Sequence, residues 1–253
     1  MKKVFLFAIT ALLFVACQKD NSEQVASGEG RIAITASTSG VVETRADGVQ
    51  VATPQESDFS LTITGKNFEK SWSKLTDYRT DDERYTAGTY TVAIACGDST
   101  QEGYNVPAFA ASKTVQVQDR NRTTEVTLTA KLSNAIVTIK TTDAFNRYFP
   151  VSEFKVTTTS NSFDFDFDRV QTDHLYIAAG QDIKIDCSCI RQSNLSAGTV
   201  EKLATQTLSN IAPTTRYVVT YDLTTVGGVK ITVKLNQTII DTIVVDTELN
   251  PNA

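Results

Sequence analysis

Alternation of apolar and polar residues along most of the chain is the feature that most constrains its fold. A period of two places successive side chains on opposite faces of an extended strand. The segments that carry it are rich in Thr, Val, Ile and aromatic residues, and no long stretch keeps the spacing of an amphipathic helix. The sequence therefore predicts an almost entirely β protein, in which short strands separated by turns form sandwiches.

The alternating segments give the expected strands. In the first half of the chain they are 31–38, 59–64, 89–95, 114–118 and 125–132, and the polar turn 119–123 joins the last two as a hairpin. In the second half they are 136–141, 154–159, 163–167, 175–177, 183–189, 216–223, 229–235 and 239–246. One short helix is expected within 193–209.

A domain boundary is expected between Ser133 and Asn134, where one set of strands ends and a fresh apolar strand begins. The chain then consists of two β-sandwich domains in tandem, 29–133 and 134–253. Each has an ordinary size for a domain.

The N-terminus has the features of a secretion signal that ends at a lipid-modified cysteine. A basic head of two lysines precedes the apolar run 4–16, which is shorter than the roughly 20 residues that span a bilayer. The small Ala16 directly before Cys17 resembles the lipobox of bacterial lipoproteins, although Phe14 stands where that pattern usually has Leu. Residues 1–17 are therefore expected to be a lipoprotein signal peptide, with Cys17 as the lipidated residue.

Acylation of Cys17 with fatty acids such as palmitate would hold the protein at a membrane, because each buried methylene contributes about 0.8 kcal/mol. The polar residues 18–28 form the expected flexible tether, and 18–20 resemble the tag that sends lipoproteins of the Bacteroidetes to the outside of the outer membrane. The expected location is therefore the outer membrane, surface-exposed and lipid-anchored. The alternative is an ordinary signal peptide cut after Ala16, which would leave a soluble periplasmic protein.

Composition argues against several classes of function. The net charge of -5 disfavours a nucleic-acid partner, which would require a basic patch. His174 is the only histidine, and the chain has no nucleophile elbow, no phosphate-binding glycine loop and no H-E-x-x-H motif. We therefore expect no enzyme activity, no cofactor and no metal ion.

The remaining cysteines and one aromatic segment have plain structural interpretations. Cys96, Cys187 and Cys189 are an odd set, so at least one thiol stays free or pairs between chains. Cys187 and Cys189 share one face of a strand and are expected to be buried. The segment 163–168 alternates Phe and Asp, which predicts an amphipathic strand with its phenyl face in the core. A calcium site on the Asp face is the weaker alternative.

The chain ends on another apolar strand, which includes Ile239, Ile240, Ile243 and Val245. A terminal strand of this kind can complete its own sheet. It can also be donated to a neighbouring subunit, where backbone hydrogen bonds supply affinity.

A set of segments resembles the fimbrillin-like, type V pilin-related surface lipoproteins of the Bacteroidetes. Besides the lipobox cysteine, these segments are 30–34, 43–46, 87–92 and 131–137. The resemblance covers most of residues 1–160 and is weaker over the second half.

In that family the precursor has two transthyretin-like Greek-key β-sandwich domains, and a trypsin-like protease cuts after an arginine in the loop that follows the first strand. The matching position is Arg45, so that Ala46 would become the new N-terminus. Loss of the lipidated strand would open a hydrophobic groove that a terminal strand of the next subunit could fill. The resemblance thus implies a fimbrial subunit or pilus-associated cell adhesion protein, with other pilin subunits or surface ligands as partners.

Two alternatives stay open at this point. Arg45 could be an ordinary solvated charge in an exposed loop. The protein could then be a monomeric surface-anchored binding module, for example for glycans, with Trp72, Tyr78, Tyr85 or Tyr104 as stacking platforms.

Overall fold

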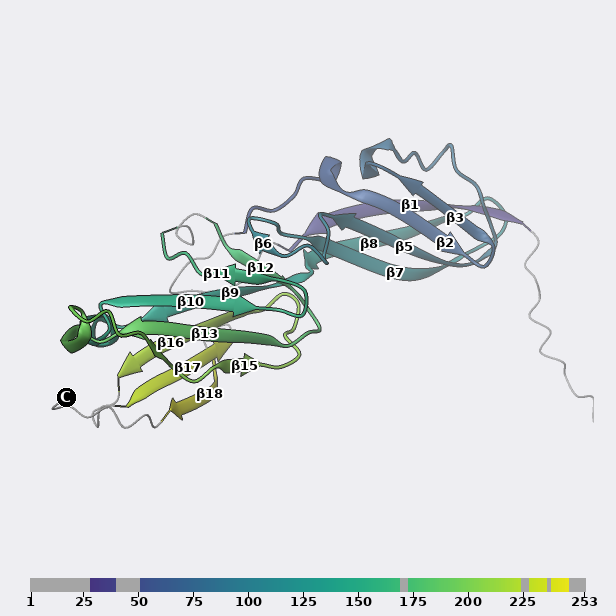
Figure 1. The fold of residues 1–253 in the computed structure, drawn as a ribbon. Helices are drawn as coiled ribbons and strands as arrows, with labels where there is room; N and C mark the ends of the chain where they lie inside the picture. The colour runs from purple at the N-terminus through teal and green to yellow at the C-terminus, as the bar shows by residue number, and fades with distance from the viewer. Residues whose placement is uncertain (1–27, 40–50, 169–172, 224–227, 236–237, 246–253) are drawn as a thin grey trace, which may run out of the picture.

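A computed structural model describes residues 28–39, 51–168, 173–223, 228–235 and 238–245 of the chain (Figure 1). Strands make up nearly all of its regular structure, and the described residues contain one α-helix, α1 (Asp143–Tyr148). Short 3-10 turns lie at Glu56–Asp58, Leu75–Asp77 and Gln192–Asn194. The all-β fold class predicted from the alternation is confirmed.

The first half of the chain folds into a seven-stranded sheet of order β3-β2-β5-β7-β8-β1-β4. Its strands are β1 (Glu29–Thr38), β2 (Ser60–Gly65), β3 (Phe68–Trp72), β4 (Tyr85–Thr86), β5 (Gly88–Cys96), β7 (Phe109–Val117) and β8 (Thr123–Leu132). β7 and β8 pair only at Phe109↔Leu132 and Ala110↔Lys131. The sheet divides there into two layers, which enclose a core that includes Ile32, Leu61 and Val126.

Two sheets build the second half. One has the order β18-β17-β16-β9-β12-β6, and the other has β11-β10-β13-β14 with β15 also paired to β13. Their strands are β6 (Gly103–Tyr104), β9 (Asn134–Thr141), β10 (Val151–Thr157), β11 (Ser162–Asp164), β12 (Leu175–Ala178), β13 (Ile183–Ile190), β14 (Glu201–Lys202), β15 (Gln206–Leu208), β16 (Arg216–Leu223), β17 (Val229–Leu235) and β18 (Thr238–Val245).

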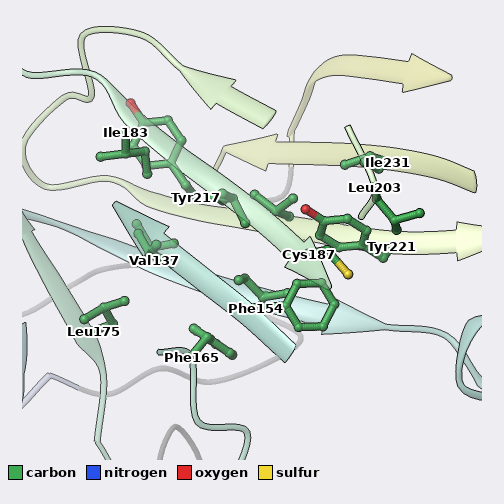
Figure 2. Packing of buried hydrophobic residues seen from close by; sticks show 14 of the residues in the cluster. Val137, Phe154, Phe165, Leu175, Ile183, Cys187, Leu203, Tyr217, Tyr221 and Ile231 are labelled. Carbon is green, nitrogen blue, oxygen red and sulfur yellow. The ribbon is translucent and has the colours of Figure 1, made fainter. Parts of the chain in front are cut away.

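Large side chains from both sheets fill the core of this second sandwich (Figure 2). The rings of Phe154 of β10 and Tyr221 of β16 pack at a tilt of 58° with centroids 4.8 Å apart, and Cys187 of β13 lies beside them. Each sandwich also contains one parallel pair, β1 with β8 and β9 with β16. The tandem sandwiches expected from the sequence are therefore present.

β6 and β12 lie side by side where the two sandwiches meet (Figure 1), and backbone and side-chain hydrogen bonds join the two sandwiches. β6 comes from the first half of the chain but pairs with β12 of the second. Asn134 is fully buried at the junction, where its Oδ1 accepts a hydrogen bond from Ala108 N at 2.6 Å and its carbonyl accepts one from Thr214 N at 3.0 Å. The junction is therefore an ordered part of the fold.

Two local predictions were wrong. The helix expected within 193–209 is absent, because that segment supplies β14 and β15 to the second sandwich. The strand expected over 163–167 stops at Asp164, where the chain leaves the sheet edge. Phe165 is still buried, whereas Phe167 is 37% exposed, so the phenyl face does not lie wholly in the core.

Candidate functional site

The position of β1 makes it the element of most functional interest, because it follows the predicted membrane tether. β1 pairs in parallel with β8 from Arg31↔Thr123 to Thr38↔Ala130. On its other side β4 pairs only with Glu29 and Gly30. The rest of that edge therefore has no strand partner among the described residues. The space that β1 occupies is called the β1 slot below.

The inner face of β1 belongs to the core. Ile32 is fully buried, and Ile34 and Ala36 pack against the same cluster while partly exposed. At Gly30 an added Cβ would lie 2.3 Å from the carbonyl oxygen of Gln118, so any larger residue would force the backbone apart. Removal of β1 would thus uncover apolar core residues along the length of the slot.

A segment from Ser73 to Arg84, here called the strap, crosses the open edge of β1. The Tyr78 hydroxyl donates a hydrogen bond of 2.6 Å to the Ile32 carbonyl. Asp81 forms an ion pair of 3.2 Å with Arg31. Leu75 anchors the start of the strap in the core. The strap therefore contacts both the backbone of β1 and one of the side chains of β1.

Aromatic rings of the first sandwich pack against Tyr78 and fix the position of the strap. Tyr78 packs edge-to-face on Trp72 with ring centroids 5.0 Å apart, and the Tyr85 hydroxyl donates to the Tyr78 hydroxyl at 3.4 Å. Tyr85 in turn contacts Phe68 and Tyr90 in edge-to-face geometry. Burial raises the pKa of both Tyr78 and Tyr85, so both phenols remain protonated donors at physiological pH.

The residues predicted for lipidation and processing, Cys17, Arg45 and Ala46, lie outside the described residues. Both roles stay predictions. The structure does place the end of β1, since Ser39 N donates to the Ala130 carbonyl at 2.9 Å, and the described chain resumes at Val51.

The predicted donor strand lies at a sheet edge in this structure. Ile239, Ile240, Ile243 and Val245 belong to β18, which pairs antiparallel with β17 and has no partner among the described residues on its other side. The terminal strand thus completes its own sheet here. Its donation to a neighbouring subunit stays a prediction.

The aromatic residues proposed as stacking platforms do not form one surface. Tyr78 and Tyr85 are 8% and 1% exposed, so that prediction was wrong for both. The Tyr104 hydroxyl donates to the Asp164 carbonyl and accepts from Asp166 N, which fixes its ring against β11. Trp72 and Tyr104 are both half-buried, and the Lys70 ammonium lies 5.1 Å from the Trp72 ring centroid.

The remaining candidates have structural roles. Cys187 and Cys189 are buried on the core face of β13, as predicted, and both are free thiols, as is the half-buried Cys96. His174 directly precedes β12, and its pKa is lowered by burial and by the nearby charge of Arg216. No group of potential metal ligands occurs in the part of the chain that the structure describes. In that same part, no helix has the length and apolarity to span a bilayer.

Sequence reasoning missed the role of the strap. In the sequence Tyr78 stands out only as one of several aromatic residues, and no local pattern marks Asp81. Forty-six positions separate Tyr78 from Ile32, and no local spacing signals a contact at that distance. The pair becomes visible only when the sheet has brought the strap over β1.

Comparison with known proteins gives a family and a set of similar folds. A family model described as a domain of unknown function, DUF4493, matches residues 28–251. No curated protein matches the chain. A fimbrial assembly protein from Parabacteroides distasonis is 7% identical, with 87% of this chain and 99% of that chain covered and a TM-score of 0.47. A candidate polysaccharide-binding protein from Bacteroides thetaiotaomicron is 8% identical, with coverage of 87% and 99% and a TM-score of 0.40. A candidate cell adhesion protein from Bacteroides eggerthii is 8% identical, with coverage of 84% and 96% and a TM-score of 0.42.

Proposed function

The chain belongs to the DUF4493 family, whose function is unknown, and we propose that it is a lipid-anchored surface protein that matures into a subunit of an adhesive fimbrium. The observation that carries this proposal is the place of β1. It is the first strand after the predicted tether, and it contributes a fully buried residue, Ile32, to the core of the first sandwich. A single cut after β1 would therefore break the covalent link between the membrane anchor and the folded domain, and departure of β1 would then open the core.

The position of Arg45 fits such a cut. It lies between Ser39, where β1 ends its pairing with β8, and Val51, where the described chain resumes. Cleavage after Arg45 would leave residues 17–45 joined to the first sandwich only through the noncovalent contacts of β1. The lipid on Cys17 would then hold the precursor at the membrane and depart with the released strand.

The opened β1 slot has the features of a binding site for an extended strand. β8 would have eight residues without a strand partner on that side, from Thr123 to Ala130, next to exposed apolar core residues. An edge of this kind binds extended peptides by β-augmentation. We propose that β18 of another subunit fills the slot, because it is a sheet edge near the end of the chain and contains Ile239, Ile240, Ile243 and Val245.

We further propose that the protein has no catalytic activity. The backbone carbonyl of the only histidine, His174, accepts a hydrogen bond from Asn105 N at 3.0 Å, and its ring lies edge-to-face with Tyr176 with ring centroids 6.3 Å apart. Among the described residues, the charged groups near its imidazole are Arg216 and Asp173. Partners are therefore expected to be other subunits or surface ligands, bound without chemistry.

Limited trypsin digestion of the purified chain tests the proposal. Wild-type protein should give a new N-terminus at Ala46, and light scattering should then show growth of polymers. An Arg45→Ala variant should stay uncut at this position and monomeric, while Arg120→Ala, which removes an arginine from the β7–β8 turn, should behave like wild type. Clean cleavage without any polymer would refute assembly by strand exchange. An uncut monomer that binds a carbohydrate array would instead support the glycan-binding module.

A further inference from the structure

We infer that Tyr78 is the residue that holds whichever strand occupies the β1 slot, through a hydrogen bond to that strand's backbone. This inference rests on the proposed function, in which β1 is replaced by a strand from another subunit. Tyr78 would thus position a strand within the chain's own fold, whereas its aromatic ring alone suggests a platform for stacking a ligand.

The contact itself does not depend on the sequence of the strand. The Tyr78 hydroxyl donates to the Ile32 carbonyl at 2.6 Å, and both groups are buried. Every residue has a backbone carbonyl, so an incoming strand of any composition presents the same acceptor at that place. A side-chain contact would be shared only if both strands carried a matching residue at that place.

The second contact between the strap and β1, the ion pair of Asp81, does depend on the sequence of the strand. Asp81 pairs at 3.2 Å with Arg31, a side chain that only the resident strand supplies at that place. The proposed donor, β18, contains no Lys or Arg between Thr238 and Val245. An exchanged strand would therefore keep the Tyr78 contact and lose the Asp81 contact. Because the Asp81 side chain is 85% exposed, the lost ion pair is a weak one.

Tyr78 is held in place by contacts that do not involve β1. Its ring packs on Trp72, its hydroxyl accepts from Tyr85, and its backbone N donates to the Leu75 carbonyl at 3.1 Å. The far end of the strap is fixed by the ion pair of Glu83 with Lys70 at 2.6 Å. The hydroxyl would therefore keep its position in an empty slot. It would be placed to donate to the backbone carbonyl of an incoming strand without first being reordered.

Hydrogen exchange on the uncleaved full chain tests the hold on the resident strand. Tyr78→Phe removes only the hydroxyl, and the reporters are the β1 amides that face β8, from Arg31 to Ser39. We expect their exchange to become about fivefold to tenfold faster, since one buried hydrogen bond is lost. The matched control is Tyr104→Phe, which removes a hydroxyl bonded to the Asp164 carbonyl at 3.1 Å in the second sandwich. Equal protection of these amides in Tyr78→Phe and Tyr104→Phe would overturn the inference.

A peptide-exchange experiment separates this inference from the proposed function. Trypsin-treated protein is mixed with a labelled peptide of residues 238–249, and the dissociation rate of the bound peptide is measured. We expect about fivefold to tenfold faster release from Tyr78→Phe, and an unchanged rate from Asp81→Asn, which should speed only the departure of β1. If the peptide never binds wild type, strand exchange fails while the hydrogen-exchange result still decides the role of Tyr78. If it leaves Tyr78→Phe and wild type at the same rate, the inference fails while exchange stands.

Discussion

Replacement of Glu102 should uncouple the two sandwiches. Glu102 lies between β5 and β6, and its carboxylate accepts four hydrogen bonds from the second half of the chain. Oε2 accepts from Thr158 Oγ1 and Asn161 Nδ2, both at 2.7 Å. Oε1 accepts from Ala178 N at 3.2 Å and from Gln181 Nε2 at 2.5 Å. One side chain of the first half thus organises a loop and a strand end of the second.

The magnitude follows from these four contacts. A hydrogen bond to a charged group contributes about 1.5–3 kcal/mol when buried, which would give roughly 6–12 kcal/mol for four. Glu102 is only half-buried, so water would satisfy most of the freed donors in the Glu102→Ala variant. We therefore expect a loss of about 2–4 kcal/mol of coupling between the sandwiches, because the penalty for unsatisfied donors is largely avoided.

Urea unfolding with two probes measures this loss. Trp72 is the only tryptophan, so its fluorescence reports the first sandwich, whereas far-ultraviolet circular dichroism reports both. Wild type should show coincident transitions, and Glu102→Ala should separate them by about 1–2 M urea for an m-value near 2 kcal/mol/M. The control is Glu125→Ala, which removes an exposed glutamate on β8. Coincident transitions at an unchanged midpoint in Glu102→Ala would refute the reasoning.

Three further predictions concern single positions. Gly30→Ala should lower the free energy of unfolding by about 1–3 kcal/mol in a denaturant titration, because its Cβ would lie 2.3 Å from the Gln118 carbonyl. Tyr221→Phe should leave that free energy unchanged or raise it by up to about 1 kcal/mol, because the buried hydroxyl has no hydrogen-bond partner among the described residues. The pKa of His174 is lowered in the folded state, mainly by burial, so the unfolded chain binds the proton first as pH falls below about 6.5. Stability should therefore decline from pH 7 to pH 5, and His174→Asn should decline less over that window in parallel thermal melts.

The alternation in the sequence was sufficient to find the strands that form the cores. β8, β13 and β16 lie within two residues of their predicted bounds, because one face of each is buried and the other is exposed or partly exposed. β3 was missed because Phe68–Trp72 is a sheet-edge strand whose residues are half-buried or exposed, which weakens the pattern. The prediction that the strand continues beyond Asp164 was wrong for the opposite reason. Its alternation continues, and Phe165 reaches the core, after the backbone has left the sheet.

Short elements and distant contacts were beyond the reach of the pattern. α1 spans only Asp143–Tyr148 and depends on Thr142, whose Oγ1 accepts from Phe145 N at 3.2 Å. Six residues are too few to establish a helical period. The contacts of Tyr78 with β1 and of Glu102 with the second half join positions at least 46 residues apart. They follow from sheet register and topology, which the sequence alone does not specify.

The direction of β1 links the predicted anchor to the proposed release. Because β1 pairs with β8 along its length, a force applied at Glu29 along the strand axis would load the ladder from Arg31 to Thr38 in shear. Hydrogen bonds loaded in shear must break together, so the anchored precursor should resist pulling while the chain is intact. A cut after Arg45 leaves those bonds in place and removes only the covalent link. The released strand could then leave along its own axis, and the rate of that step would depend on the Tyr78 contact with Ile32.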